Sequence, residues 1–157
     1  MPNGSIKPNA RRLMEGWLPE ARVGIPIIAK KGWLGGVNYI VHLIEAVALL
    51  RDYERPRLYL VVRDHFLEPD CLRMHERVFK HIDGIYYVGP RRDTAELLLG
   101  GANFVKDEDE LFEYLDFYYP VHADCFPGKP AASWVPDFQE LHLPEFFDEK
   151  ELAKRRG

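Results

Sequence analysis

The sequence is poor in cysteine and has no long hydrophobic run. Cys71 and Cys125 are its two cysteines among 157 residues, and neither belongs to a Cys-x-x-Cys pair. This spacing argues against a structural zinc site, and a cytosolic protein with free thiols is the default. No run of about 18 apolar residues is present, which excludes a membrane-spanning helix, and the N-terminus lacks the apolar core of a secretion signal. We therefore expect a cytoplasmic protein without a transmembrane segment, which could also dock peripherally at the inner membrane face.

A basic excess is missing as well. The chain has 21 Lys and Arg residues against 25 Asp and Glu residues, a net charge of −4. No general positive field therefore favours nucleic acid as a partner. The hydrophobic fraction of 46% is typical of a globular protein, and the length allows one domain with one core. Aromatic residues are plentiful at 13%, and such rings suit stacking on sugars or bases, or equally a protein interface.

Strand-like and helix-like segments alternate along the chain after a leader at residues 1–22. We expect strands at 23–29, 57–62, 85–88, 104–105, 117–121 and 131–135. We expect helices at 37–51, 69–81, 94–99 and 107–115. This alternation predicts an α/β fold with a Rossmann-like parallel sheet, helices on both faces and a single domain over 23–157. Pro26 conflicts with a central position for the first strand, because proline lacks a backbone donor.

The expected helix at 37–51 is apolar almost all round. Its polar exceptions are Asn38, His42 and Glu45, which form one narrow stripe. Such a stripe either reaches a site or makes ordinary polar contacts.

A glycine-rich segment, 32–36, lies between the first expected strand and this helix. It reads Gly-Trp-Leu-Gly-Gly. Glycines there allow backbone N–H groups to approach an anion, and the helix N-terminus adds a favourable partial charge. The spacing matches neither GxGxxG nor the P-loop, and a plain tight turn is the alternative.

Other polar residues also follow expected strands. Arg63, Asp64 and His65 follow the second strand, and His122 and Asp124 follow the strand at 117–121. Pro136 ends the last strand, and the acid, amide and imidazole that come after it are Asp137, Gln139 and His142. Since parallel strands end at one edge of a sheet, these residues are expected to share a rim with the glycines. The alternative is a set of surface loops and an ordinary strand-to-helix junction.

Three stretches together resemble a known family. They are Gly35-Gly36-Val37-Asn38-Tyr39, Trp134-Val135-Pro136-Asp137-Phe138-Gln139 and Leu141-His142-Leu143-Pro144-Glu145-Phe146-Phe147. They resemble the N-terminal domain of GT-B type retaining glycosyltransferases, nearest to the family-four, or glycosyl transferase group 1, enzymes. The resemblance covers about 23–157. It implies one of two Rossmann-like domains that face each other across a cleft, here the acceptor-side domain.

The resemblance also implies roles for individual residues. Gly35 and Gly36 would lie at the donor diphosphate, and His122 would lie near the transferred sugar. We add Asn38 as a further donor-diphosphate candidate and expect His122 and Asp137 to be the catalytic residues. The substrate-binding candidates are Trp33, His65, Gln139 and His142. The donor would be a nucleotide-diphosphate sugar, the acceptor a carbohydrate or lipid-linked hydroxyl, and neither a metal nor a further cofactor is implied.

Two departures from the family affect this interpretation. Glu140 stands where the family usually has a histidine, and the sequence ends at Gly157 without the donor-binding domain. We therefore expect half of a glycosyltransferase, inactive alone, that needs the missing domain or a partner chain. The alternatives are a non-catalytic binding or scaffold subunit that pairs with a donor-binding chain, and a fragment. An uncovered cleft wall would also self-associate, with 138–147, Tyr118, Tyr119 and Phe126 as candidate contacts.

Overall fold

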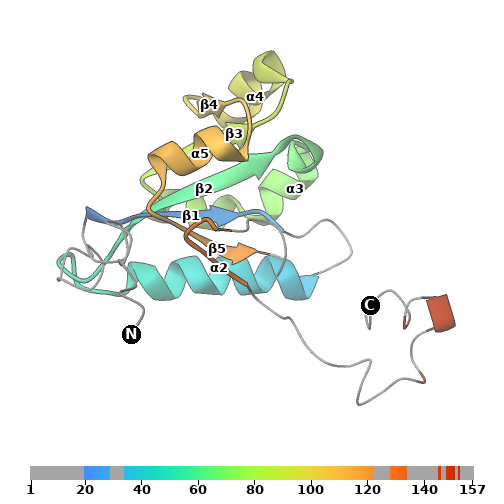
Figure 1. Cartoon of the computed structure of the whole chain (residues 1–157), viewed down its shortest axis with the longest axis horizontal. Coiled ribbons are helices and arrows are strands. Elements are labelled where there is room, and N and C mark those ends of the chain that lie inside the picture. The colour runs from blue at the N-terminus through green and yellow to red at the C-terminus, as the bar shows by residue number, and fades with distance from the viewer. Residues whose placement is uncertain are drawn as a thin grey trace, which may run out of the picture.

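The computed structural model describes residues 20–28, 34–121, 128–133, 145, 148–150 and 152. These residues form a sheet of six parallel strands in the order β4-β3-β2-β1-β5-β6 (Figure 1). The strands are β1 (Arg22–Pro26), β2 (Arg57–Arg63), β3 (Gly84–Val88), β4 (Asn103–Val105), β5 (Phe117–Val121) and β6 (Ala131–Ser133). The expected Rossmann-like α/β fold is therefore confirmed.

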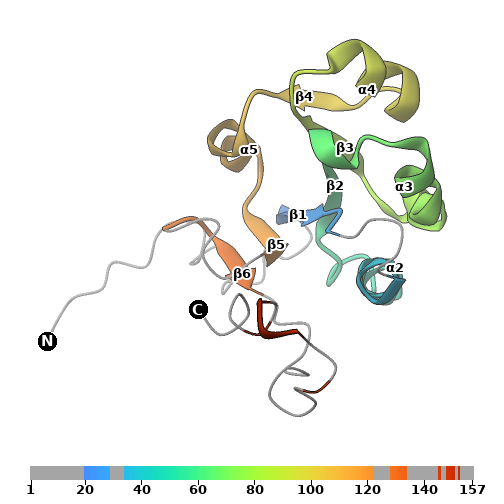
Figure 2. The ribbon, with the colours of Figure 1, turned by 90° about the vertical axis from the view of Figure 1, so that its right-hand side faces the viewer.

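Helices cover both faces of this sheet. They are α2 (Leu34–Ala48), α3 (Pro69–Met74), α4 (Arg92–Leu99) and α5 (Glu108–Tyr114), with 3₁₀ turns η2 (Asp64–Phe66) and η3 (Glu76–His81). Figure 2 shows α2, α3 and α4 on one face and α5 on the other. Each face has its own core. Ile40, Ile44 and Leu60 belong to the first core cluster, on the α2 face, and Val61, Leu111 and Tyr118 to the second, on the α5 face.

Strand β1 is central, and Pro26 is its last residue, so the strand is shorter than the expected 23–29. The Ile27 N–H donates to the Val61 carbonyl of β2 at 3.0 Å. Successive N–H groups along a strand point to alternate neighbours, so the donor that Pro26 lacks would face β5. Pairing between β1 and β5 is recorded at Val23 and Gly24, before the proline. A proline is therefore compatible with this central strand, because it lies at the strand's end, beyond the residues that pair with β5.

The expected helix at 69–81 is wrong as one continuous element, because α3 gives way to the 3₁₀ turn η3 at His75. The His75 ring nitrogen Nδ1 lies 2.9 Å from the Cys71 carbonyl oxygen. The ring therefore occupies the carbonyl that an α-helical N–H of His75 would use. That N–H bonds instead to the Leu72 carbonyl at 2.9 Å, in the 3₁₀ pattern.

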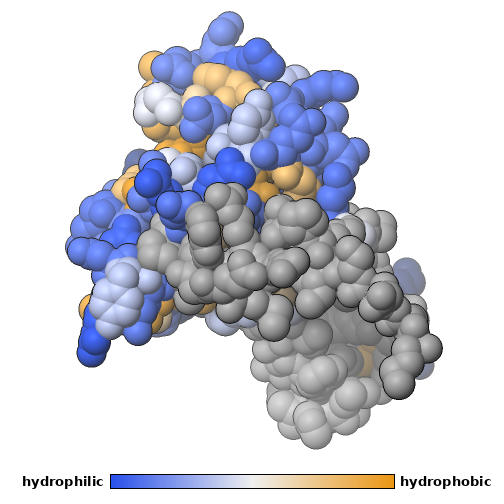
Figure 3. All heavy atoms as spheres, turned by 60° about the vertical axis from the view of Figure 1, so that its left-hand side comes forward, coloured by the Kyte–Doolittle hydropathy of each residue, from blue (hydrophilic) through white to orange (hydrophobic). Residues whose placement is uncertain are grey.

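Figure 3 shows one face of the molecule, whose described part is mostly hydrophilic with small separate hydrophobic patches. None of the helices in the described ranges is long and apolar enough to cross a bilayer.

Tyr118 has no exposed surface, because its ring packs edge-on against Phe112 in the second core cluster. The expectation that Tyr118 belongs to a self-associating face is therefore wrong, whereas Tyr119 is half-buried.

Candidate functional site at the carboxyl edge of the sheet

The strand order reverses between β1 and β5. The chain runs outward through β1, β2, β3 and β4 on one side and then returns to place β5 beside β1. Open α/β sheets bind ligands outside the carboxyl ends of the strands at such a switch point. The segments that follow β1 and β5 therefore define the candidate site.

The two glycines of the predicted site lie in the first turn of α2, the helix that follows β1. The expectation of a loop up to Gly36 is wrong, because α2 already begins at Leu34; Gly35 is exposed and Gly36 is buried. The first N–H groups of a helix have no partner within it, and α2 has no acidic residue in its first turn. The turn beside the switch point therefore suits an anion.

The polar stripe of α2 faces outward. Asn38 and His42 are exposed, and Glu45 accepts hydrogen bonds from the Arg77 guanidinium at 2.7 and 3.0 Å. Asn38 thus lies one turn into the helix on its exposed side.

A pair of tyrosines that the sequence did not reveal connects α2 to β5. The hydroxyls of Tyr39 and Tyr119 are hydrogen-bonded to each other, and both residues are half-buried. Burial, and then the bond to Tyr119, raise the pKa of Tyr39 to about 12. Tyr39 therefore keeps its proton at neutral pH, and the pair joins the two elements that flank the switch point.

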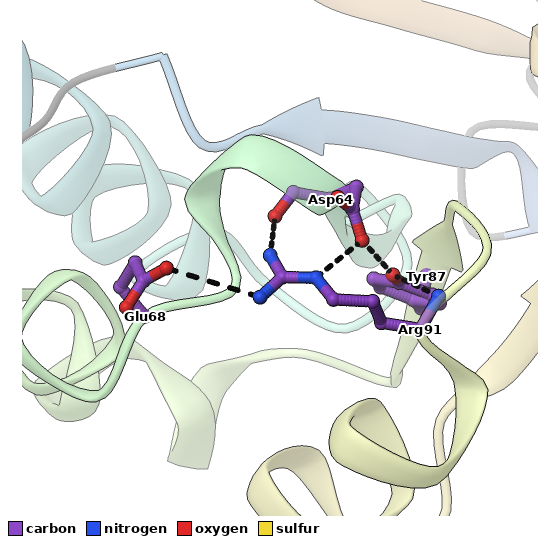
Figure 4. Close-up of polar contacts among 4 residues, drawn as sticks. All are labelled: Asp64, Glu68, Tyr87 and Arg91. Carbon is purple, nitrogen blue, oxygen red and sulfur yellow. Dashed lines mark hydrogen bonds and ion pairs between the residues drawn. The ribbon is translucent and has the colours of Figure 1, made fainter.

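A second polar group lies at the ends of β2 and β3 (Figure 4). The Asp64 carboxylate accepts hydrogen bonds from the Tyr87 hydroxyl and, at 2.8 Å, from Arg91 Nε. Arg91 also donates through Nη2 to the Asp64 carbonyl, and its Nη1 lies 3.9 Å from Glu68. Arg91, and then Tyr87, hold the pKa of Asp64 below its usual value. We call these four residues the Asp64 cluster.

The Asp64 cluster occupies a known functional position of Rossmann folds. In dinucleotide-binding domains an acidic side chain after the second strand forms a hydrogen bond to the ribose. Here the Asp64 carboxylate instead accepts hydrogen bonds from Tyr87 and Arg91. Gly89 permits this close packing, because a Cβ there would lie 2.7 Å from both the Asp64 Cβ and the Tyr87 hydroxyl. The cluster therefore links the segment that follows β2 to the segment that follows β3 through hydrogen bonds.

His65 follows this cluster in the η2 turn. Its ring packs on Phe66 at a centroid distance of 4.2 Å, and the residue is exposed at the same edge as the α2 first turn. The topology thus brings Gly35, Gly36 and His65 to one edge, with His65 on the β2 side of the switch point.

The remaining predicted site residues lie outside the described residues. They are Trp33, His122, Asp137, Gln139 and His142. Within the described ranges, no group of three or more His, Cys, Asp or Glu side chains could hold a metal ion. Comparison of the chain with protein-family models, curated proteins and solved structures gives no match.

Proposed function

We propose that the chain is the acceptor-side domain of a GT-B type retaining glycosyltransferase. The observation that carries this proposal is the glycine pair in the first turn of α2, at the carboxyl edge beside the β1–β5 switch point. The family-like stretches at 35–39, 134–139 and 141–147 add support from the sequence. A second domain, or a partner chain, would supply most of the donor-binding surface.

The proposed reaction moves a sugar from a nucleotide-diphosphate donor to an acceptor hydroxyl. The bond between the anomeric carbon and the diphosphate oxygen breaks, and that carbon bonds to the acceptor oxygen, whose proton is released. The N–H groups of Gly35 and Gly36 and the α2 dipole would stabilise the negative charge on the leaving diphosphate. His122 and Asp137 would orient the acceptor, a carbohydrate or lipid-linked sugar met in the cytoplasm or at the inner membrane face.

A transfer assay on two preparations tests this proposal. The first is the purified 157-residue chain, and the second is the protein purified through a tag placed at its natural gene locus. With a panel of labelled nucleotide sugars, we expect transfer by the natural preparation and none above the buffer blank by the chain alone.

Two results would contradict the proposal. Turnover by the chain alone would show that it needs no second domain. A natural preparation that transfers no sugar from any donor would favour the alternative of a non-catalytic binding or scaffold subunit.

A further inference from the structure

Three tyrosines lie together on the α5 face of the sheet, toward the amino ends of the strands. Tyr59 of β2 and Tyr86 of β3 are neighbours, with ring centroids 5.4 Å apart. Tyr114, the last residue of α5, stacks on Tyr86 at a centroid distance of 5.8 Å and an interplanar angle of 23°. We call these three residues the tyrosine row. Among the described helices α5 alone lies on this face (Figure 2), and Tyr114 stays 40% exposed.

The hydroxyls of the tyrosine row have no hydrogen-bond partner among the described residues. Tyr86 is the most informative of the three, because the residue is only 8% exposed. Its hydroxyl is nevertheless not one of the fully enclosed atoms that lack a partner, so it reaches the solvent while its ring is buried. A buried tyrosine usually bonds its hydroxyl to the protein. The Tyr86 hydroxyl is therefore placed to bond a molecule from outside.

Gly84 and Asn103 border the row on the side of β4. Gly84 stands opposite Tyr59, and a Cβ there would lie 3.2 Å from the Tyr59 ring and 4.0 Å from the Asn103 amide nitrogen. Asn103 stands opposite Tyr86 on β4 and is exposed, and its amide donates to the Ile85 carbonyl at 3.4 Å. The missing side chain at Gly84 thus leaves the Tyr59 ring accessible beside an exposed amide.

Two arginines lie at the amino end of the row. Arg22 and Arg57 are register partners on β1 and β2, and strand alternation puts Arg57 on the same face as Tyr59. The Asp116 carboxylate accepts hydrogen bonds from the Arg22 guanidinium at 3.2 and 3.4 Å, which neutralises that charge. Arg57 is exposed, and its guanidinium has no acidic partner among the described residues. The tyrosine row therefore ends at an uncompensated positive charge.

This combination of groups favours one class of ligand. The Arg57 charge disfavours a cation. An apolar protein side chain would cover the rings but leave the tyrosine hydroxyls and the Asn103 amide unsatisfied. A sugar ring has an apolar face that packs on an aromatic ring, and its hydroxyls both donate and accept hydrogen bonds. A carboxylate on that sugar would form a charge-assisted bidentate pair with a guanidinium.

We propose that the tyrosine row binds an acidic oligosaccharide. Its sugar rings would pack on Tyr59 and Tyr114, and a sugar carboxylate would pair with Arg57. The Tyr86 hydroxyl and the Asn103 amide would bond to sugar hydroxyls. The glycine turn of α2 lies at the carboxyl edge of the sheet, whereas this row lies toward the amino edge. The inference therefore names a second site and does not rest on the proposed function.

Isothermal titration calorimetry of the full chain tests the proposal. The probes are trisaccharides of galacturonic, glucuronic and mannuronic acid, each paired with its methyl ester. The ester keeps the rings and hydroxyls and removes the charge. We expect at least one acid to bind, and its ester to bind about tenfold more weakly. If the chain binds none of the acids, the proposal is wrong.

Substitutions assign the binding to this face. Arg57→Gln should weaken binding of the acid about tenfold and leave that of the ester unchanged, because only a charge pair is lost. Tyr86→Phe should weaken binding of both about fivefold. It should not change the free energy of unfolding in denaturant, since that hydroxyl has no partner among the described residues. Arg92→Gln, on α4 at the opposite face, is the matched control and should change neither affinity.

Several results would overturn the inference. Esters that bind as tightly as the acids, or an Arg57→Gln variant with wild-type affinity for the acid, would exclude the charged contact. Wild-type affinity of Tyr86→Phe would show that the sugar binds elsewhere. A dimer in sedimentation that Tyr114→Ala converts to a monomer would identify the row as a contact between copies of the chain. Each of these results leaves the proposed sugar transfer at the carboxyl edge to its own assay.

Discussion

At the scale of single residues, His75 is a titratable group enclosed by the core. It has no exposed surface, and its Nδ1 bonds the Cys71 carbonyl. Its Nε2 has no hydrogen-bond partner among the described residues. Burial lowers the pKa of His75, opposed in part by the bond to Cys71. The folded protein therefore favours a neutral imidazole.

This environment predicts a loss of stability on acidification. An imidazole in the unfolded chain has a pKa of about 6.5. Below that pH the unfolded state therefore binds a proton at the His75 ring more readily than the native state does. The contribution of His75 is complete above pH ~6.5 and falls below it by up to about 1.4 kcal/mol per pH unit. Denaturant unfolding between pH 7.5 and 5, in steps of about half a unit, measures it.

A second measurement makes the His75 prediction specific. NMR titration of the His75 ring in the native protein should show a pKa below the unfolded value. A ring that protonates at or above pH ~6.5 while the protein stays folded would refute the prediction.

Several site residues could not be predicted because their partners are distant in sequence. Asp64 was a candidate from its place after a strand, but its partner Arg91 lies 27 positions on, after β3. Tyr39 belonged to a quoted motif, yet only the β1–β5 adjacency brings Tyr119 to it. The period of a helix or strand places a residue on a face, but which faces meet depends on topology.

At the scale of elements, boundaries were predicted less well than the elements themselves. Helix α2 begins at Leu34 although no Ser, Thr, Asp or Asn directly precedes it, so the usual N-cap pattern is absent. Glycine disfavours helices, which made 35–36 look like a loop. By contrast, α5 begins after Asp107, whose carboxylate accepts from the Glu110 N–H at 3.0 Å, and the helix expected at 107–115 agrees closely with α5.

The pairing of β1 with β5 depends on the absence of a side chain at Gly24. A Cβ there would lie 2.3 Å from Leu115 Cδ1 and 2.8 Å from Tyr118 Cδ2. Both neighbours are buried, so neither can move freely. We expect Gly24→Ala to lower the free energy of unfolding by about 1–3 kcal/mol, measured by urea denaturation.

A double-mutant cycle identifies the contact responsible. Leu115→Ala removes the nearer atom and alone should cost about 2–5 kcal/mol as a buried leucine truncation. With Leu115→Ala present, the methyl group that Gly24→Ala introduces enters the vacated space, so the double variant should lose clearly less than the sum of the two single losses. Strict additivity would show that the clash lies elsewhere.

At the scale of the whole molecule, the alternation of strands and helices was enough to predict a parallel Rossmann-like sheet. Each expected strand corresponds to an observed one, because buried parallel strands read as short apolar runs between helices. The position of β5 beside β1 rather than beyond β4 could not be read from such runs. That position creates the switch point, and with it the candidate site.

The most direct test of this account is sugar transfer by the natural preparation carrying Gly36→Val or Gly36→Ala. Gly36 is buried in the first turn of α2, and a side chain there would keep a diphosphate from the backbone N–H groups. We predict that Gly36→Val lowers transfer at least tenfold, with Gly36→Ala between it and wild type, and that the loss of transfer is much larger than the loss of folded protein measured by denaturant unfolding. Transfer that stays at the wild-type rate, or falls only in proportion to the loss of folded protein, would contradict the account.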